Sequence, residues 1–322
     1  MIYSLYPVFK EAIWGGEKLK ETYGKESPLP RIAESWELSC HPDGVSSIGV
    51  AGFDGSGPVP LTEFIRIRGK AEVLGSRPAA FPSFPVLIKL IDAAKDLSIQ
   101  VHPDDRYAMR VEGASGKTEM WYIIDCEEDA SILYGFNRPV SQEEVRSAAL
   151  DGTLPTLCNR VPVHKGDVFW INAGTLHAIG GGITLAEIQQ NSDLTYRLYD
   201  YGRLGADGKP RELHLDKALD VLKLEKPARM GPIGRKEYHQ GYTRTLLCSC
   251  HYFTVSEIDL TGEYMGFATP LSFHCLTVAD GEVIIENEGQ RAEGKKGDSF
   301  LIPAGAGVYC LRGRGKTLIT TV

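Results

Sequence analysis

Residues 166–179 read GDVFWINAGTLHAI, and residues 297–310 read GDSFLIPAGAGVYC. The two segments align without gaps and share a glycine, an aspartate, a phenylalanine, an isoleucine, an alanine and a second glycine. The two segments start at residues 166 and 297, and a repeat separated by 131 residues indicates two copies of one architecture, one in each part of the chain. The copies differ where His177 of the first segment aligns with Val308 of the second. A histidine that does chemistry would therefore place the active site in the first copy.

Outside the repeat, most of the chain has the pattern of short strands separated by Gly, Pro and Asp turns, which is typical of a sandwich or barrel. Two segments favour helices. Ser141 is a suitable N-cap for a helix that ends at Gly152, and residues 213–224 carry leucines near helical spacing. The strand candidates are 98–102, 119–125, 130–135, 166–171, 183–190, 195–200, 271–278, 281–286, 297–302 and 317–322.

These patterns predict a mainly β protein with two domains, which agrees with 322 residues at roughly 150 residues per domain. We expect an N-terminal catalytic domain at 1–225 with a helical insert at about 140–152 and 213–224. Residues 226–242 are rich in Pro, Gly and polar residues and are the expected linker. Residues 243–322 then form the second domain, without a metal site.

Composition excludes several classes of protein. The net charge of −7 and the pI of about 5.7 argue against nucleic acid or an anionic membrane as the main partner. Seven irregularly spaced cysteines indicate reduced thiols rather than a disulfide framework. The first residues have no basic segment followed by an apolar run, and no stretch reaches the ~20 apolar residues of a membrane span. We expect a cytoplasmic protein.

Polar side chains alternate along the expected strand 98–102. Ser98, Gln100 and His102 share one face, and Ile99 and Val101 share the other. A polar inner face is costly in a β-protein unless it lines a pocket or binds a ligand. This strand therefore predicts part of a site.

Other strands repeat this alternation. Lys117, Glu119 and Trp121 share a face, as do Glu187, Gln189 and Asn191, and as do Thr195, Arg197 and Tyr199. Two histidines, a carboxylate and an amide form a reasonable mixed N/O metal site. Zinc fits such a set, although these ligand types alone do not exclude iron or manganese. Gln100 and His102 can bind one ion from one strand, and Glu119 and His177 have to come from neighbouring strands.

The motifs carry a resemblance. The pattern G-x5-N-x-G-x2-H at 166–177 resembles the second cupin motif, and Gln100-x-His102 followed by Glu119 resembles a modified first motif. Together with five longer segments, they resemble the short bacterial type I mannose-6-phosphate isomerases. These segments are AIWGGEKL (12–19), ESWELSCHPDG (34–44), FPVLIKLIDAAKDLSIQVHPDD (84–105), GKTEMWYII (116–124) and GDVFWINAGTLHAIGGGITLAEIQQNSDLTYRLYDYGR (166–203).

The resemblance implies a fold and a set of site residues. The fold is two cupin-type (jelly-roll) β-barrels with a short helical segment, and the cofactor is one Zn²⁺ per chain. The implied metal ligands are Gln100, His102, Glu119 and His177; the catalytic arginine is Arg197; the phosphate-side residues are Ser98, Lys89 and Arg203; and Lys117 and Glu187 fall on active-site positions.

The implied reaction interconverts D-mannose 6-phosphate and D-fructose 6-phosphate by zinc-assisted proton transfer through a cis-enediol. The base is Glu187 or Lys117, and the sequence leaves this open. Arg197 is no ordinary base because its pKa exceeds ~12, so it neutralises the enediolate or holds phosphate. Lys89 and Arg203 would offset a phosphate charge of about −1.5 to −2. The expected partner is a small sugar phosphate, with no nucleic acid and no membrane, and the sequence does not indicate an oligomeric state.

Two other functions use the same residues. An Fe(II) oxygenase would favour a histidine-rich ligand set, against which Gln100 and the neighbouring basic residues count. A non-catalytic sugar-phosphate sensor would be signalled by loss of His102, Glu119 or Arg197, and all three are present. Analysis of the bound metal separates the first alternative from an isomerase, and an assay for fructose 6-phosphate formation separates the second.

Overall fold

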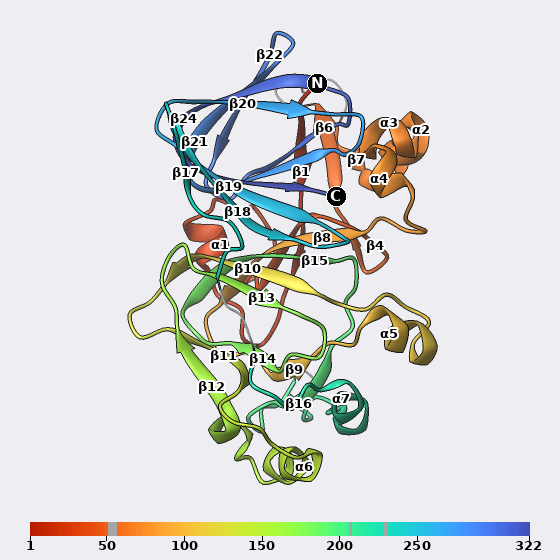
Figure 1. The fold of residues 1–322 in the computed structure, drawn as a ribbon, viewed down its shortest axis with the longest axis vertical. Helices are drawn as coiled ribbons and strands as arrows, with labels where there is room; N and C mark the ends of the chain where they lie inside the picture. The colour runs from red at the N-terminus through yellow and green to blue at the C-terminus, as the bar shows by residue number, and fades with distance from the viewer. Residues whose placement is uncertain (51–56, 206–207, 228–230) are drawn as a thin grey trace.

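The computed structural model describes residues 1–50, 57–205, 208–227 and 231–322, which form two halves stacked along the long axis (Figure 1). The fold is mainly β, as predicted from the sequence. The upper half combines strands from both ends of the chain, and the lower half holds the middle of the chain together with β2 and β3 from its N-terminal part. Within the expected linker 226–242, residues 228–230 lie outside the described residues, and 237–239 form a strand.

The upper half contains an eleven-stranded sheet in the order β17-β18-β19-β24-β21-β23-β1-β6-β7, with β20 on β24 and β22 on β21. Strands from the N-terminus thus pair with strands from the C-terminus, which the sequence pattern did not predict. The strands are β1 (Tyr3–Tyr6), β6 (Ser47–Val50), β7 (Val59–Pro60), β17 (Glu237–His239), β18 (Tyr242–Ser249), β19 (Thr254–Leu260), β20 (Glu263–Ala268), β21 (His274–Asn287), β22 (Gln290–Lys295), β23 (Ser299–Ile302) and β24 (Gly307–Thr321).

The lower half contains two facing sheets. The six-stranded sheet has the order β13 (Val168–Ile171), β10 (Glu119–Cys126), β15 (Ile183–Gln190), β8 (Val86–Ala93), β3 (Glu34–Leu38), β2 (Val8–Lys10). The five-stranded sheet has the order β12 (Cys158–Pro162), β11 (Ser131–Phe136), β14 (His177–Ile179), β9 (Ile99–Val101), β16 (Tyr196–Tyr199). A small hairpin joins β4 (Cys40–His41) and β5 (Gly44–Val45).

Short helices lie around the sheets. They are α1 (Lys18–Glu21), α2 (Leu61–Arg68), α3 (Lys70–Leu74), α4 (Ser76–Ala79), α5 (Asp105–Val111), α6 (Gln142–Leu150) and α7 (Leu215–Val221), with a 3-10 turn at Leu154–Leu157. The two predicted helical segments are confirmed: Ser141 caps α6 by accepting a hydrogen bond from the Glu144 amide, and α7 lies within 213–224. None of the helices in the described ranges is long and apolar enough to cross a membrane.

Buried apolar side chains form separate cores within and between these layers. Ile99 and Val101 of β9 pack outward with α6 and α7, as the alternation predicted. Trp121 and Ile179 meet between the two lower sheets. Leu90 of β8 contributes to a core shared with the upper half. A fourth core fills the upper half itself. The polar inner positions of the lower half therefore sit between two well-packed sheets.

Candidate active site

The five-stranded sheet places four polar or aromatic side chains in one transverse row. Register pairs Tyr134 with His177, His177 with Gln100, and Gln100 with Arg197. Directly paired residues in antiparallel strands point to the same face, so these side chains lie next to one another. Ser98 and His102 flank Gln100 on the same face of that strand.

The six-stranded sheet supplies the opposing row. Trp121 pairs with Glu187, Glu187 with Lys89, and Lys89 with Trp36. Glu119 lies two residues before Trp121 on β10 and therefore points to the same face. The two sheets thus direct carboxylates and lysines from one side toward imidazoles and an arginine from the other.

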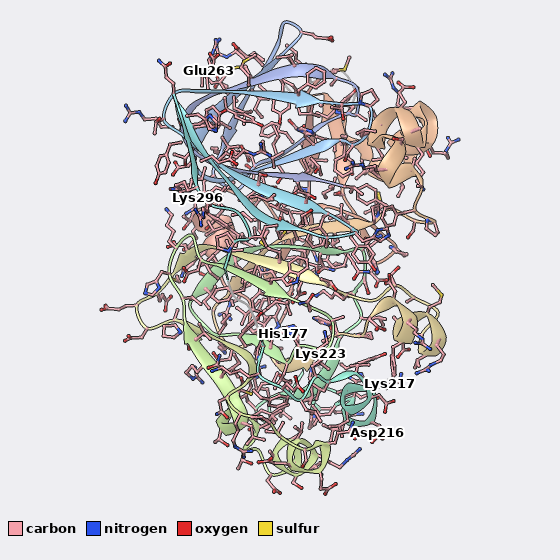
Figure 2. The ribbon with its side chains drawn as sticks, viewed as in Figure 1. His177, Asp216, Lys217, Lys223, Glu263 and Lys296 are labelled. Carbon is pink, nitrogen blue, oxygen red and sulfur yellow. The ribbon has the colours of Figure 1, made fainter. Side chains whose placement is uncertain are left out.

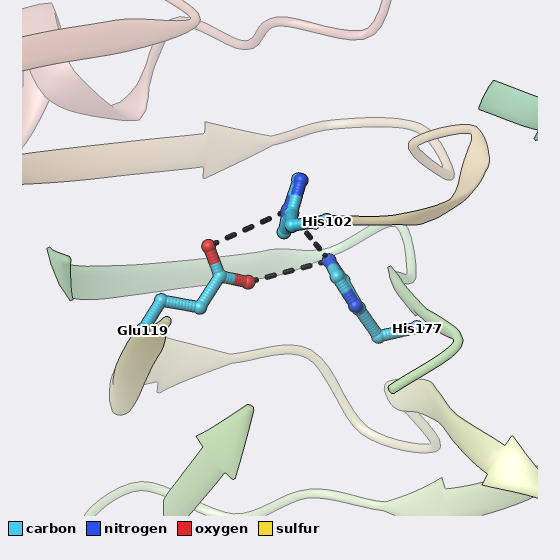
Figure 3. A group of neighbouring side chains, drawn as sticks. All are labelled: His102, Glu119 and His177. Carbon is cyan, nitrogen blue, oxygen red and sulfur yellow. Dashed lines mark hydrogen bonds and ion pairs between the residues drawn. The ribbon is translucent and has the colours of Figure 1, made fainter. Parts of the chain in front are cut away.

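His102, Glu119 and His177 form a buried cluster whose ligand atoms all lie within 4.8 Å of one another (Figure 3). The two imidazole Nε2 atoms are 3.1 Å apart. Glu119 directs Oε1 to His177 Nε2 at 3.3 Å and Oε2 to His102 Nε2 at 3.7 Å. We call these three residues the His–Glu–His cluster. Figure 2 shows His177 inside the lower half.

Backbone carbonyls determine which imidazole nitrogens carry protons. His102 Nδ1 is 2.7 Å from the Leu194 carbonyl, and His177 Nδ1 is 2.8 Å from the Thr175 carbonyl. A carbonyl only accepts, so each Nδ1 is protonated and each Nε2 presents a lone pair to the centre of the cluster. Such outer hydrogen bonds are usual for metal-binding histidines.

The centre of the cluster fits a divalent cation. Two Nε2 lone pairs face each other beside Glu119, whose Oε2 contacts the Lys117 ammonium at 2.9 Å, whereas its buried Oε1 has no hydrogen-bond donor. Buried acceptors that face one another without a proton are unfavourable unless a cation lies between them. Two imidazoles and a carboxylate are ligands that zinc accepts. Gln100, next to His177 in the sheet, is placed to add an amide oxygen.

Burial keeps both imidazoles neutral, as metal ligands must be. It lowers the pKa of His177 to about 4. The pKa of His102 is lowered well below its usual value by burial, and also by Lys117 and His177. Protonation would therefore not compete with a metal at neutral pH.

Lys117 and Glu187 lie beside the cluster. Lys117 Nζ is 2.9 Å from Glu119 Oε2 and 3.3 Å from Glu187 Oε1. Burial acts to lower the pKa of Lys117, but Glu119 and Glu187 outweigh it and raise this pKa above its usual value. Glu187 also accepts a hydrogen bond from Trp121 Nε1 at 3.0 Å, and burial, followed by Glu119, raises its pKa. The pair therefore consists of a firmly charged ammonium and a carboxylate of raised basicity.

A cavity of about 340 Å³ begins at Lys117 and Glu187 and is open to solvent. Ser98, Gln100, Lys117, Glu187 and Arg197 all line it. We call it the catalytic cavity. A larger hollow of about 780 Å³ lies between β21, β22 and β24 of the upper half, and it shares no lining residue with the catalytic cavity.

Lys89 and Arg203 have different surroundings. Lys89 lines the catalytic cavity, and its Nζ lies 3.1 Å from Glu34, 3.8 Å from Asp193 and 3.9 Å from Glu187. Arg203 is absent from the cavity lining, because its guanidinium binds Asp200 and the Asp96 carbonyl. The structure thus brings together all the expected site residues except Arg203.

One cavity residue had no signal in the sequence. Arg211 lines the cavity beside Arg197 and forms a two-pronged ion pair with Asp200, with Nε–Oδ2 at 2.7 Å and Nη2–Oδ1 at 2.6 Å. It follows a loop rather than a patterned strand, so periodicity could not identify it. The charge-rich run KPRE (209–212) is the only local hint.

The upper half has replaced the corresponding ligands. Ile171 pairs with Glu119, and its counterpart in the repeat, Ile302, pairs with His274. His274 thus occupies the position of Glu119, and its Nδ1 is 2.8 Å from Tyr309 Oη. Val308 stands where the first copy has His177. Among the described residues, the only group of three or more His, Cys, Asp or Glu side chains placed to hold a metal is in the lower half.

Comparisons with known proteins point to one family. The profile "Phosphomannose isomerase type I, catalytic domain" matches residues 2–126. The profile "Mannose-6-phosphate isomerase, cupin domain" matches residues 243–322. Both matches fall within segments that the sequence patterns had assigned to separate copies of the fold.

Whole-chain relatives agree. Mannose-6-phosphate isomerase ManA of Bacillus subtilis is 39% identical over 98% of this chain and 96% of its own length. The crystal structure of the mannose 6-phosphate isomerase from Bacillus subtilis superposes with a TM-score of 0.88 at 35% identity, covering 100% of this chain and 99% of its own. A mannose 6-phosphate isomerase solved with zinc and yttrium shares the fold, with a TM-score of 0.76 at 19% identity over 99% of this chain and 98% of its own.

Proposed function

The chain belongs to the type I phosphomannose isomerase family, and from this premise we propose that it interconverts D-mannose 6-phosphate and D-fructose 6-phosphate through a cis-enediol. The observation that carries the proposal is the buried His–Glu–His cluster, whose Glu119 contacts Lys117 in the wall of the catalytic cavity. The buried Lys117 and Glu187 form the inner end of that cavity, and the half-buried Arg197 and Arg211 form its outer end. That arrangement suits a substrate with an oxygen-rich reacting end and an anionic tail.

We assign one Zn²⁺ per chain to His102, Glu119 and His177, with Gln100 as a fourth ligand. When bound, zinc would supply positive charge that stabilises negative charge developing on the sugar oxygens. The two neutral imidazoles and the buried Glu119 Oε1, which has no hydrogen-bond donor, support this assignment.

Proton transfer is assigned to Glu187. Lys117 lies between two carboxylates and stays an ammonium, so it has no lone pair with which to accept a proton. Glu187 removes the C2 proton of the aldose and returns it to C1, while a hydroxyl proton moves from O2 to O1, and no external acid is consumed. Lys117, two residues before β10, and Arg197 on β16 both line the catalytic cavity and would offset the negative charge of the intermediate.

The phosphate would lie at the outer end of the catalytic cavity, against Ser98 and Arg197. Arg197 Nε donates to Ser98 Oγ at 3.3 Å, which holds both groups toward the same space. The roles of Lys89 and Arg203 in phosphate binding stay predictions, since each already has acidic partners: Glu34 lies beside Lys89, and Asp200 beside Arg203.

The remaining expectations belong to the same proposal. We propose that each half is a cupin-type barrel, that residues 243–322 support the catalytic half without binding metal, and that the protein works in the cytoplasm. A small sugar phosphate is the proposed partner, and no nucleic acid or membrane surface is needed for the reaction.

A coupled assay for fructose 6-phosphate, combined with elemental analysis, tests the function. We expect activity that a chelator abolishes and zinc restores, with about one zinc per chain. His177→Ala should lose both metal and activity. His164→Ala, which changes an exposed histidine outside the cluster, should lose neither. A fully active His177→Ala protein would disprove the metal assignment, and iron in the purified protein without isomerase activity would favour an oxygenase.

A further inference from the structure

Positive charge is unevenly compensated along the catalytic cavity. At the inner end, Lys89 pairs with Glu34, and Lys117 pairs with Glu119 and Glu187. At the outer end, Arg197 forms hydrogen bonds to neutral acceptors, Ser98 Oγ and the Glu212 carbonyl, at 3.3 and 2.8 Å. It forms no ion pair with any described residue. The unpaired positive charge therefore lies at the end of the catalytic cavity that is away from the His–Glu–His cluster.

Arg211 adds to this surplus. Asp200 is the carboxylate that both Arg203 and Arg211 bind, whereas Arg197 forms an ion pair neither with Asp200 nor with Glu212, the two carboxylates near it. Asp200 is 5% exposed and the Arg211 side chain 24%, so solvent screens the cluster only in part. A partly buried excess of positive charge is unfavourable unless a bound anion offsets it.

The three arginines differ in whether they face the catalytic cavity. Arg211 and Arg197 both line the catalytic cavity, whereas Arg203 is directed to Asp200 and the Asp96 carbonyl. The two-pronged contact with Asp200 holds the planar Arg211 guanidinium in one orientation before any ligand arrives. Asp200 occupies Nε and Nη2, so the Nη1 side of the fixed guanidinium is the part that can donate to a phosphate oxygen.

We infer that Arg211, oriented by Asp200, is the second phosphate-binding cation of the catalytic cavity, beside Arg197, and that Arg203 only helps to hold Asp200. This assignment rests on the proposed function for the identity of the sugar phosphate. It replaces Arg203, the residue that the family resemblance suggested, with a residue eight positions further along the loop. Asp200 is a positioning residue, because it acts through Arg211.

Steady-state kinetics on the zinc-loaded full chain test the assignment. Arg211→Ala should raise the KM for mannose 6-phosphate about 10- to 100-fold, the usual effect of losing one charged phosphate contact, with a smaller change in kcat. Arg211→Lys keeps the charge without the fork and should fall between Arg211→Ala and the wild type. Asp200→Asn should raise KM in the same direction by loosening Arg211.

Two comparisons sharpen the result. Arg203→Ala should raise KM less than Arg211→Ala does. Arg146→Ala, which breaks an exposed pair with Asp216 on the outer helices, should leave KM unchanged. Inorganic phosphate as a competitive inhibitor should weaken in parallel with KM in Arg211→Ala, because it probes the anion site alone. A KM that rises in Arg203→Ala but not in Arg211→Ala would overturn the inference.

The test distinguishes this inference from the proposed function. An active wild type whose Arg211→Ala variant keeps its KM and its phosphate inhibition refutes the role of Arg211 and leaves the isomerase intact. An inactive wild type that nevertheless binds inorganic phosphate, seen by ³¹P NMR and lost in Arg211→Ala, supports the anion site and refutes the isomerase.

Discussion

The site residues of the lower half are oriented and protonated by neighbours that contact them on the side away from the proposed ligand. Leu194 and Thr175 contribute only backbone carbonyls, yet these carbonyls place the protons on His102 and His177. The same holds for Asp200, which has no contact with the cluster but aligns Arg211. Residues that touch neither metal nor substrate therefore determine how the site is charged.

Replacing the proposed base, Glu187, should lower kcat without changing the zinc content. Glu187→Gln keeps the shape of the side chain and a partner for Trp121 but cannot accept a proton. We expect kcat to fall about 10²- to 10⁴-fold, with zinc content unchanged. Glu257→Gln is the matched control, because Glu257 is a buried carboxylate that accepts a hydrogen bond from Tyr122 outside the cavity. Full activity of Glu187→Gln would leave Lys117 as the base.

His274 gives a pH-dependent stability that is separate from catalysis. Burial lowers the pKa of His274 to about 4, whereas the unfolded chain has the ordinary value of 6.5. Between these values the unfolded state binds a proton that the folded state does not, so the free energy of unfolding falls as pH drops from 6.5 to 4. Above 6.5 neither state is protonated, and the contribution vanishes.

The measurement compares urea unfolding of the wild type and His274→Gln at pH 7 and pH 5. Gln keeps a partner for Tyr309 Oη but does not titrate. The wild type should lose about 1–2 kcal/mol more than the variant on acidification, less than full linkage because His274 is partly exposed. Equal losses in both proteins would show that His274 is protonated in the folded state.

At the level of secondary structure, local pattern identified the elements that build the site. Alternation in β9, β10 and β15 predicted which side chains face inward, and a capping sequence predicted the start of α6. Helices α2 to α4 were not predicted because Gly69 and Gly75 divide them into pieces too short for a clear period. Arg211 was not predicted because a loop has no period at all.

The cap of α6 allows a simple test at this scale. Ser141 Oγ accepts the Glu144 amide at 3.1 Å, so Ser141→Ala leaves a helix-end donor without its partner. We expect a loss of about 1 kcal/mol in the free energy of unfolding, measured with urea. Ser147→Ala lies in the same helix away from its cap and should be neutral or slightly stabilising. Similar losses from both changes would contradict a capping role.

The whole molecule is held together by a core that both halves share. Ile88 and Leu90 from the six-stranded sheet join Phe273 and Leu318 from the upper half in one buried cluster. Polar contacts cross the same boundary, including Tyr122 Oη to Glu257. Partner choice across this boundary was not predictable from the sequence, because alternation shows which face is buried but not what covers it.

Deleting residues 243–322 should therefore remove the active site as well as the upper half. The deletion takes away β18 to β24, exposes Ile88 and Leu90, and leaves β1 without β23. We expect residues 1–242 alone to be insoluble and inactive. Producing 1–242 and 243–322 together as two chains should restore soluble isomerase. A soluble, active 1–242 would show that the lower half folds independently.

The pairing of β1 with β23 has a consequence for synthesis on the ribosome. Tyr3 lies opposite Leu301, so the first strand to emerge waits for almost the entire chain before one of its two neighbours exists. Until then, one edge of that strand stays open to pairing with other nascent chains. Translation speed and chaperone access near the amino terminus should therefore influence the yield of this protein more than events near its last residues.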